Sequence, residues 1–270
     1  MAKSVLQARA EQVAQRFCDS ARKPIVVEFA GVPKAGKTST ITHVQAFLKR
    51  CGFRTEVVVE RASVCPIRDK KHANFNVWTA CTTLAQILEK TQDPPRVDDP
   101  HILILDRGLF DAACWMTMME NLARIRRADR EVIEKFLIMP DWRKRISVIV
   151  LMIASAKDAL NREKGVLPVE NGKGSIMNRD VLKRIRETTL KCKERFKDKF
   201  RICQVDTSSG KTKNNPKRTA EVVARAILDA VEEQIEEDIL FLKKGDVQKL
   251  FGGRVYLPAS KAKPLGLTTK

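Results

Sequence analysis

The sequence lacks any hydrophobic run long enough to cross a lipid bilayer. A membrane-spanning helix needs about 20 consecutive apolar residues, and the most apolar stretch, RISVIVLMIA at 145–154, is far shorter. The N-terminus has a mixed polar composition without the hydrophobic core of a signal peptide. These absences predict a soluble cytoplasmic protein without a membrane partner.

Cysteine and histidine are scarce in the arrangements that build metal or redox centres. No pair of cysteines forms C-x-x-C, and the three histidines share no metal-ligand spacing, which argues against a zinc site. The odd number of scattered cysteines predicts reduced core residues of an intracellular protein. These cysteines are Cys18, Cys51, Cys65, Cys81, Cys114, Cys192 and Cys203.

The sequence has fewer acidic than basic side chains. The chain of 270 residues has 51 Lys and Arg against 33 Asp and Glu, a formal net charge of +18. Such a surface attracts anions, so nucleotides, nucleic acid and anionic membranes all fit it. The basic residues are spread through the chain and not gathered in one block, which is slightly more typical of a generally basic surface.

One motif is complete: G-x-x-x-x-G-K-[ST], the pattern of a phosphate-binding loop. An apolar run at 25–30 reads as a buried strand before it, and residues 38–50 read as a helix after it, which is the context that the motif requires. Backbone amides of such a loop and the helix N-terminus bind phosphates. We therefore predict an ATP site formed by Gly31, Val32, Pro33, Lys34, Ala35, Gly36, Lys37, Thr38 and Ser39.

The rest of the chain alternates between strand and helix patterns. Further strands are expected at 55–60, 101–105, 145–154 and 200–206, and further helices at 3–21, 74–90, 111–138, 156–163, 179–199 and 218–242. The first helix is expected to pack beside the first strand. This alternation predicts an α/β fold, the three-layer P-loop NTPase with a five-stranded parallel sheet flanked by helices.

The domain organisation is predicted from the same pattern. Residues 1–242 are expected to form one kinase-like domain with an N-terminal helix and a lid at about 156–178, where the sequence is rich in glycine and charge. Residues 243–270 are expected to be a C-terminal extension with a basic tail. The number of subunits is open, with a homodimer as the expected assembly.

Charged residues follow several of the predicted strands. Because ligands of parallel sheets bind at the carboxyl ends of the strands, these side chains are candidates for the site. Glu60 could take a proton from an attacking hydroxyl, and Asp106 could hold Mg²⁺ together with Thr38. Arg107 could clamp a substrate phosphate or form an internal ion pair, and Arg162 could neutralise the transferring charge. In the helix expected at 74–90, Phe75, Trp78 and Gln86 could contact a base, although the two aromatic side chains are more typical of a core.

The chain resembles the thymidylate kinase and deoxynucleoside kinase superfamily over about residues 25–228. The resemblance rests on EFAGVPKAGKT, the strand-end Glu60, the Asp106-Arg107-Gly108 triplet, and an apolar strand followed by ALNREKG. It implies that Glu60 acts as base or substrate positioner, that Asp106 and Arg107 handle Mg²⁺ and substrate, and that Arg162 is a lid arginine. Where the family usually has proline after the glutamate, this chain has Arg61.

Lys37 is expected to hold the outer phosphates, and the residues together predict an ATP- and Mg²⁺-dependent kinase whose acceptor is a nucleoside or nucleoside monophosphate. Two other functions stay open. The positive charge and the basic segment 61–71 fit a 5′-hydroxyl polynucleotide kinase that acts on DNA or RNA ends. The motif alone also fits an ATP-hydrolysing switch component of a larger assembly.

Overall fold

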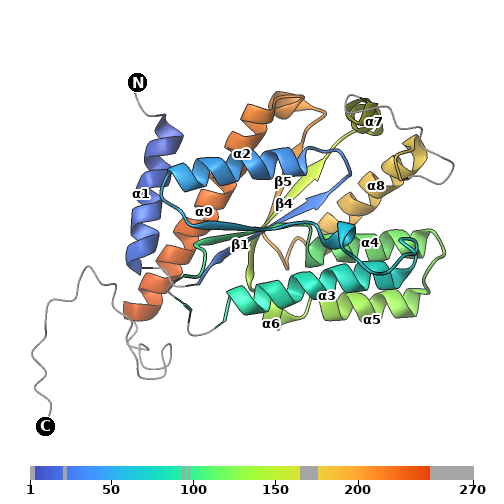
Figure 1. Cartoon of the computed structure of the whole chain (residues 1–270), viewed down its shortest axis with the longest axis horizontal. Coiled ribbons are helices and arrows are strands. Elements are labelled where there is room, and N and C mark those ends of the chain that lie inside the picture. The colour runs from blue at the N-terminus through green and yellow to red at the C-terminus, as the bar shows by residue number, and fades with distance from the viewer. Residues whose placement is uncertain (1–3, 21–22, 93–94, 97, 165–175, 244–270) are drawn as a thin grey trace, which may run out of the picture.

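Five parallel strands form one sheet at the centre of the molecule (Figure 1). The computed structural model describes residues 4–20, 23–92, 95–96, 98–164 and 176–243. The strands are β1 (Ile25–Gly31), β2 (Thr55–Val58), β3 (Ile102–Asp106), β4 (Ile146–Ile153) and β5 (Ile202–Asp206). Their spatial order is β2-β3-β1-β4-β5, and every neighbouring pair is parallel. The predicted five-stranded parallel sheet is confirmed.

Helices cover both faces of the sheet and complete the three-layer α/β arrangement (Figure 1). On one side lie α1 (Val5–Ser20), α2 (Lys37–Arg50) and α9 (Pro216–Lys243), where α1 and α2 each contact α9. On the other side lie α3 (Ala73–Lys90), α4 (Leu109–Asn121), α5 (Arg127–Leu137) and α8 (Arg179–Phe196). Shorter helices are α6 (Pro140–Arg143), α7 (Ala156–Lys164), η1 (Arg61–Ser63) and η2 (Gly210–Thr212).

The central strands are apolar because both of their faces are covered. Every residue of β1 and β3 is buried, and β4 is buried at all positions except Ser147. Glu28 differs from the apolar residues around it, because it is an acidic residue in the middle of β1 with no exposed surface. Such a residue needs hydrogen-bond partners inside the protein, and these partners are described with the site.

The helix predicted over 111–138 is wrong, because the chain folds back after Asn121 and forms two helices, α4 and α5. Ala123, in the turn, has a φ of 55°, a left-handed conformation that non-glycine residues rarely adopt. The local sequence contains neither glycine nor proline, so it gives no signal that predicts this turn. The two helices then pack against each other.

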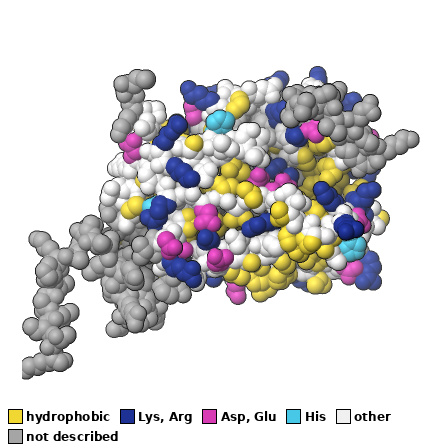
Figure 2. Space-filling model, viewed as in Figure 1, with side chains coloured by type: hydrophobic (Ala, Val, Ile, Leu, Met, Phe, Trp, Pro, Cys, Tyr) yellow, Lys and Arg dark blue, Asp and Glu magenta, His cyan; other side chains and the backbone are white. Residues whose placement is uncertain are grey.

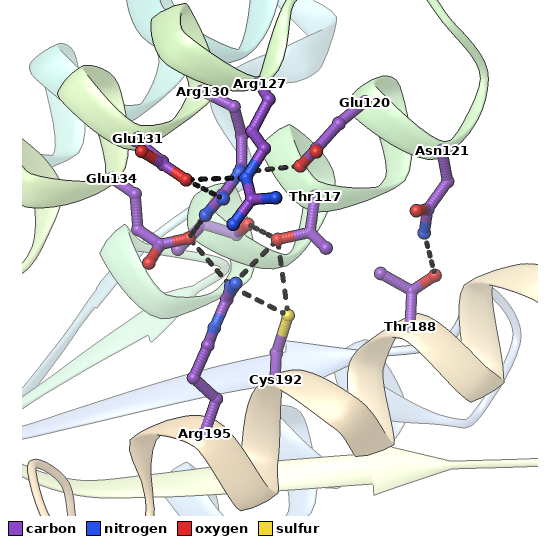
Figure 3. A network of polar contacts seen from close by, with 11 residues as sticks. Thr117, Glu120, Asn121, Arg127, Arg130, Glu131, Glu134, Thr188, Cys192 and Arg195 are labelled. Carbon is purple, nitrogen blue, oxygen red and sulfur yellow. Dashed lines mark hydrogen bonds and ion pairs between the residues drawn. The ribbon is translucent and has the colours of Figure 1, made fainter.

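A network of ion pairs fixes α5 and α8 against α4 (Figure 3). The guanidinium of Arg130, on α5, is buried and pairs with Glu120 on α4 and Glu134 on its own helix, each at 2.7 Å. Arg195, on α8, also reaches Glu134 at 2.7 Å and donates a hydrogen bond to Thr117 at 2.9 Å. Breaking one member would leave a buried charge unpaired, so the network holds α4 in a defined place.

The N-terminal helix packs mainly on α9, and not beside the first strand as expected from the sequence. Ala10, Val13 and Phe17 form its buried face. Arg9 pairs with Asp229 and Glu232 of α9 at 2.6 and 2.5 Å. The first helix therefore lies against the later part of α9, the last helix of the described chain (Figure 1).

The helix at 156–164 begins the predicted lid, but residues 165–175 and the predicted tail from residue 244 lie outside the described residues. The division into a domain and an extension stays a prediction. None of the described helices has the length and apolar character needed to cross a membrane.

Candidate active site

The phosphate-binding loop lies between β1 and α2 and is held against the end of β4. Gly31 has a φ of 119°, and a Cβ atom at this position would lie 2.1 Å from the carbonyl oxygen of Met152. The next residue, Val32, donates its N–H to the same oxygen at 3.1 Å. Only glycine fits this close approach, and Gly36, with a φ of 91°, allows the chain to enter α2.

Lys37 is buried against its own loop. Its ammonium donates to the carbonyl oxygens of Gly31 at 3.2 Å and Val32 at 3.0 Å. Burial lowers the pKa of Lys37 to about 8, and the nearby positive charge of Arg107 acts in the same direction. A phosphate near this amine would oppose both effects, because an anion favours the charged form.

Thr38 and Asp106 meet where α2 begins and β3 ends. The Thr38 hydroxyl donates to Oδ2 of Asp106 at 3.1 Å. The other carboxylate oxygen, Oδ1, is buried and has no hydrogen-bond partner. Oxygen ligands of this kind suit Mg²⁺, which takes one or two protein oxygens and completes its shell with water and phosphate. The two predicted metal residues therefore lie together and fit such an ion.

In the described part of the chain, no group of three or more His, Cys, Asp or Glu side chains could hold a metal ion alone. This finding is compatible with Mg²⁺, since its protein ligands are few.

Arg107 joins the ends of two strands to helix α4. Its Nε lies 2.7 Å from Glu60, which follows β2, and its Nη1 lies 2.7 Å from Asp111. The residue has a φ of 71°, and its backbone N–H bonds to the carbonyl of Phe29 in β1. Strained backbone of this kind persists only where its surroundings hold it, and it is frequent at functional sites.

Asp111 was not among the residues predicted from the sequence. Its carboxylate accepts hydrogen bonds from the backbone N–H of Gly31 at 2.9 Å and from the indole of Trp115 at 3.1 Å, besides the Arg107 pair. It thus ties the first glycine of the phosphate loop to α4. The signal was present in D-R-x-x-x-D, because residues four apart on a helix face each other.

Glu28 was also not among the residues predicted from the sequence, and it holds the backbone of Asp111 in place. Its carboxyl group accepts from the backbone N–H groups of Phe110 at 3.2 Å and Asp111 at 2.8 Å, at the start of α4. Burial raises its pKa to about 8, although these amide hydrogen bonds act in the opposite direction. Gly108 leaves room for it, since a Cβ there would lie 2.7 Å from the carboxyl oxygen.

A cavity of about 550 Å³ opens beside the phosphate loop. This volume is within the range of small-molecule sites, about 300–1,000 Å³. Pro33, Glu60, Asp106, Arg107 and Asp111 line one part of it. The helices α3 and α4 supply an apolar wall that includes Phe75, Trp115, Met118, Met119 and Leu122.

Of the side chains proposed for base contacts, Phe75 lines this cavity. Trp78 and Gln86 are not among its lining residues, and Gln86 donates a hydrogen bond to Glu89 on its own helix.

Arg162 contacts the phosphate loop but lies apart from the cavity that Glu60, Asp106 and Arg107 line. Its guanidinium donates to the carbonyl oxygens of Lys34 and Thr207 at 3.0 and 2.8 Å, and to Asn214 at 2.9 Å. It does not line the cavity. In this arrangement the residue joins α7 to the outer side of the phosphate loop, beside the Lys34–Glu163 ion pair of 2.5 Å. Its role in neutralising charge stays a prediction.

No protein family model and no curated protein matches this sequence. Among solved structures, it is similar to the deoxyadenosine kinase of M. mycoides with bound dCTP. The TM-score is 0.53 at 15% identity, over 76% of this chain and all of the kinase. The complex with dATP gives 0.53 at 14% identity, over 75% and 98% of the two chains.

A third match is the same kinase with the products dCMP and a flexible dCDP, with a TM-score of 0.51 and 14% identity, over 82% of this chain and all of that one. At these identities the likeness shows the fold. The chain has the α/β fold of the P-loop deoxynucleoside kinases, as the sequence predicted.

Proposed function

We propose that this protein is a kinase that transfers the γ-phosphoryl group of ATP to a nucleoside or nucleotide acceptor. The bond between the γ-phosphorus and the bridging oxygen of ADP breaks, and a bond to an acceptor oxygen forms. A hydroxyl acceptor loses its proton, so ATP and the acceptor give ADP, the phosphorylated acceptor and H⁺. An acceptor phosphate would react in the same way through an oxygen that is already ionised at neutral pH.

The residues of the phosphate loop and Lys37 hold the triphosphate in this proposal. Backbone N–H groups at 36–38, where α2 begins, favour a bound anion. Thr38 and Asp106 would hold Mg²⁺, which would neutralise charge on the phosphates. In phosphoryl transfer, positioning and charge neutralisation supply most of the rate.

Glu60 and Arg107 are proposed to handle the acceptor. Both side chains line the cavity together with Asp106 and Pro33 of the phosphate loop, so a group bound there could contact them beside the loop. The carboxylate of Glu60 is partly exposed and could accept the proton of a hydroxyl group. Arg107 could then exchange one of its ion pairs for a phosphate oxygen.

The single observation that supports this proposal is the bridge made by Arg107 and Asp111. One guanidinium contacts the acceptor-side Glu60, and its partner Asp111 holds the first glycine of the phosphate loop. The two halves of a two-substrate site are thereby joined by direct contacts. A loop that only bound and hydrolysed ATP would not need a neighbouring cavity of substrate size.

A panel of nucleosides and nucleoside monophosphates, incubated with labelled ATP, tests the proposal. Labelled product that disappears in Lys37→Ala but persists in Lys49→Ala would support it, because Lys49 is an exposed lysine at the far end of the same helix. ATP turnover without a phosphorylated acceptor would instead favour the switch component. The homodimer stays a prediction, which sedimentation would test.

A further inference from the structure

The acceptor cavity has a second end that carries a different set of charges. Lys70, Lys71 and Arg124 line it together with Arg61, and these four cations lie on two segments far apart in sequence. Lys70, Lys71 and Arg124 are exposed and form no ion pair with any described residue. The Nε of Arg61 is buried and has no hydrogen-bond partner.

Three of these cations gather at the end of the cavity that is remote from the phosphate loop. The amide of Asn76, in the first turn of α3, lies 3.6 Å from the sulfur of Met119, near the end of α4. The two helices are therefore antiparallel there, and Lys70 and Lys71, just before α3, lie near Arg124, just after α4. On the face shown in Figure 2, Lys and Arg side chains gather at the end of the molecule where α3 begins in Figure 1.

The length of α4 gives the distance between the two ends of the cavity. Helix α4 has 13 residues, which correspond to roughly 20 Å of helix axis. Arg107 precedes this helix and Arg124 follows it. A molecule that reacts beside Arg107 and extends along α4 would present its other end to the three cations.

We propose that the acceptor carries a phosphate or phosphodiester on the side away from its reacting group. This inference rests on the proposed kinase function. An unmodified nucleoside is neutral and offers these cations no partner. The 5′-hydroxyl end of a short oligonucleotide carries phosphates along this length, whereas the phosphate of a nucleoside 3′-phosphate stays beside its own sugar. Several neighbouring cations without carboxylate partners favour the longer ligand.

The test compares four acceptors at fixed ATP: a nucleoside, its 5′-monophosphate, its 3′-phosphate and a trinucleotide that has a 5′-hydroxyl and a 3′-phosphate and so carries three phosphates. The kcat/KM for the trinucleotide should exceed that for the nucleoside at least about tenfold, since three cations add their attraction. Comparing the kcat/KM of the 3′-phosphate with that of the trinucleotide shows whether one phosphate is enough or a longer strand is needed. Equal values for the nucleoside and both 3′-extended acceptors would overturn the inference.

The variant Lys70→Gln, Lys71→Gln, Arg124→Gln should bring that ratio close to one. The matched control is Lys49→Gln, Arg50→Gln, Lys144→Gln, which removes three exposed charges from the segments that precede β2 and β4 and should keep the ratio. A ratio that survives in the first variant would contradict the inference.

Equilibrium binding of the trinucleotide, measured without ATP, separates this inference from the kinase proposal. The wild-type protein should lose affinity with salt along a log–log slope of about −2, the value for three phosphate contacts on a single strand, and the triple variant should flatten it. If no acceptor is phosphorylated, the kinase proposal fails while this measurement still decides the inference. Binding with the same salt slope in both proteins would overturn it.

Discussion

The two ends of the acceptor cavity hold their charges in opposite ways. Near the phosphate loop, Arg107 is paired on both sides by Glu60 and Asp111, and Lys37 donates to backbone carbonyl groups. At the remote end, Lys70, Lys71 and Arg124 have no carboxylate partner among the described residues. The difference indicates that the first end is built as a rigid support, whereas the second leaves its charges available to a ligand.

The largest expected effect comes from the rigid end. Lys37→Ala removes the cation that is proposed to neutralise the outer phosphates, so kcat/KM should fall by at least about 100-fold, the usual loss when a charge-stabilising group is removed. Steady-state kinetics with the best acceptor measures this loss, with Lys49→Ala as control. Near wild-type turnover in Lys37→Ala would contradict the assignment of the phosphate loop.

Arg107→Ala should affect both activity and stability, because it leaves the buried Asp111 without its ion pair. Activity should fall by about 100-fold or more. The free energy of unfolding should fall by about 3 kcal/mol, the lower end of the cost of breaking a buried pair. Denaturant unfolding and kinetics check the two effects, and Arg126→Ala, at an exposed ion pair, is the control. An Arg107→Ala protein as stable as this control would show that the bridge is not structural.

Glu28 allows a pH test of the same end. Its raised pKa means that the folded protein keeps a proton which the unfolded chain releases between about pH 4.5 and pH 8. The contribution of Glu28 to stability is thus complete below pH 4.5 and is lost as the pH rises to 8, by up to about 1.4 kcal/mol per pH unit.

Glu28→Gln removes this titration, and its amide nitrogen cannot accept one of the two backbone hydrogen bonds. The wild-type protein should therefore be more stable than the variant at pH 5, and the gap should shrink towards pH 8. Urea unfolding at several pH values measures the gap. A gap that stays constant over this range would exclude a raised pKa.

The smallest expected effect belongs to the remote end. The variant Lys70→Gln, Lys71→Gln, Arg124→Gln should change the free energy of unfolding by no more than about 0.5 kcal/mol, as is usual for surface substitutions without partners. Thermal unfolding checks this, with the Arg107→Ala protein as the contrasting case. A strongly destabilised triple variant would mean that these cations support the fold, and the contrast between the two ends would be lost.

The sequence predicted the sheet and the phosphate loop because both depend on local patterns. The apolar strands are read from runs such as ILIL at 102–105, and the motif around Lys37 is read from its letters. Asp106 and Arg107 followed from the rule on strand ends, and the structure places both residues beside Glu60 and the phosphate loop.

What the sequence did not predict depends on tertiary contacts. The turn at Ala123 has no glycine or proline, so only the packing of α5 on α4 explains it. In the sequence, Glu28 is a single acidic residue within an apolar strand. Its role depends on hydrogen bonds from the backbone amides at the start of α4, which only the folded structure shows. The cavity is formed by residues from several segments that are far apart in the sequence, so no local sequence pattern could predict it.

Helix α4 has a consequence for the choice of substrate. Its first turn is anchored through Asp111, and its last turn leads to Arg124, so in the proposed reaction the length of the helix would set the distance between the reacting end and the anionic end of an acceptor. Each added or deleted turn would change that measure by about 5.4 Å. The preferred length of the substrate would then be encoded in the number of residues in one helix, independently of the groups that perform the chemistry.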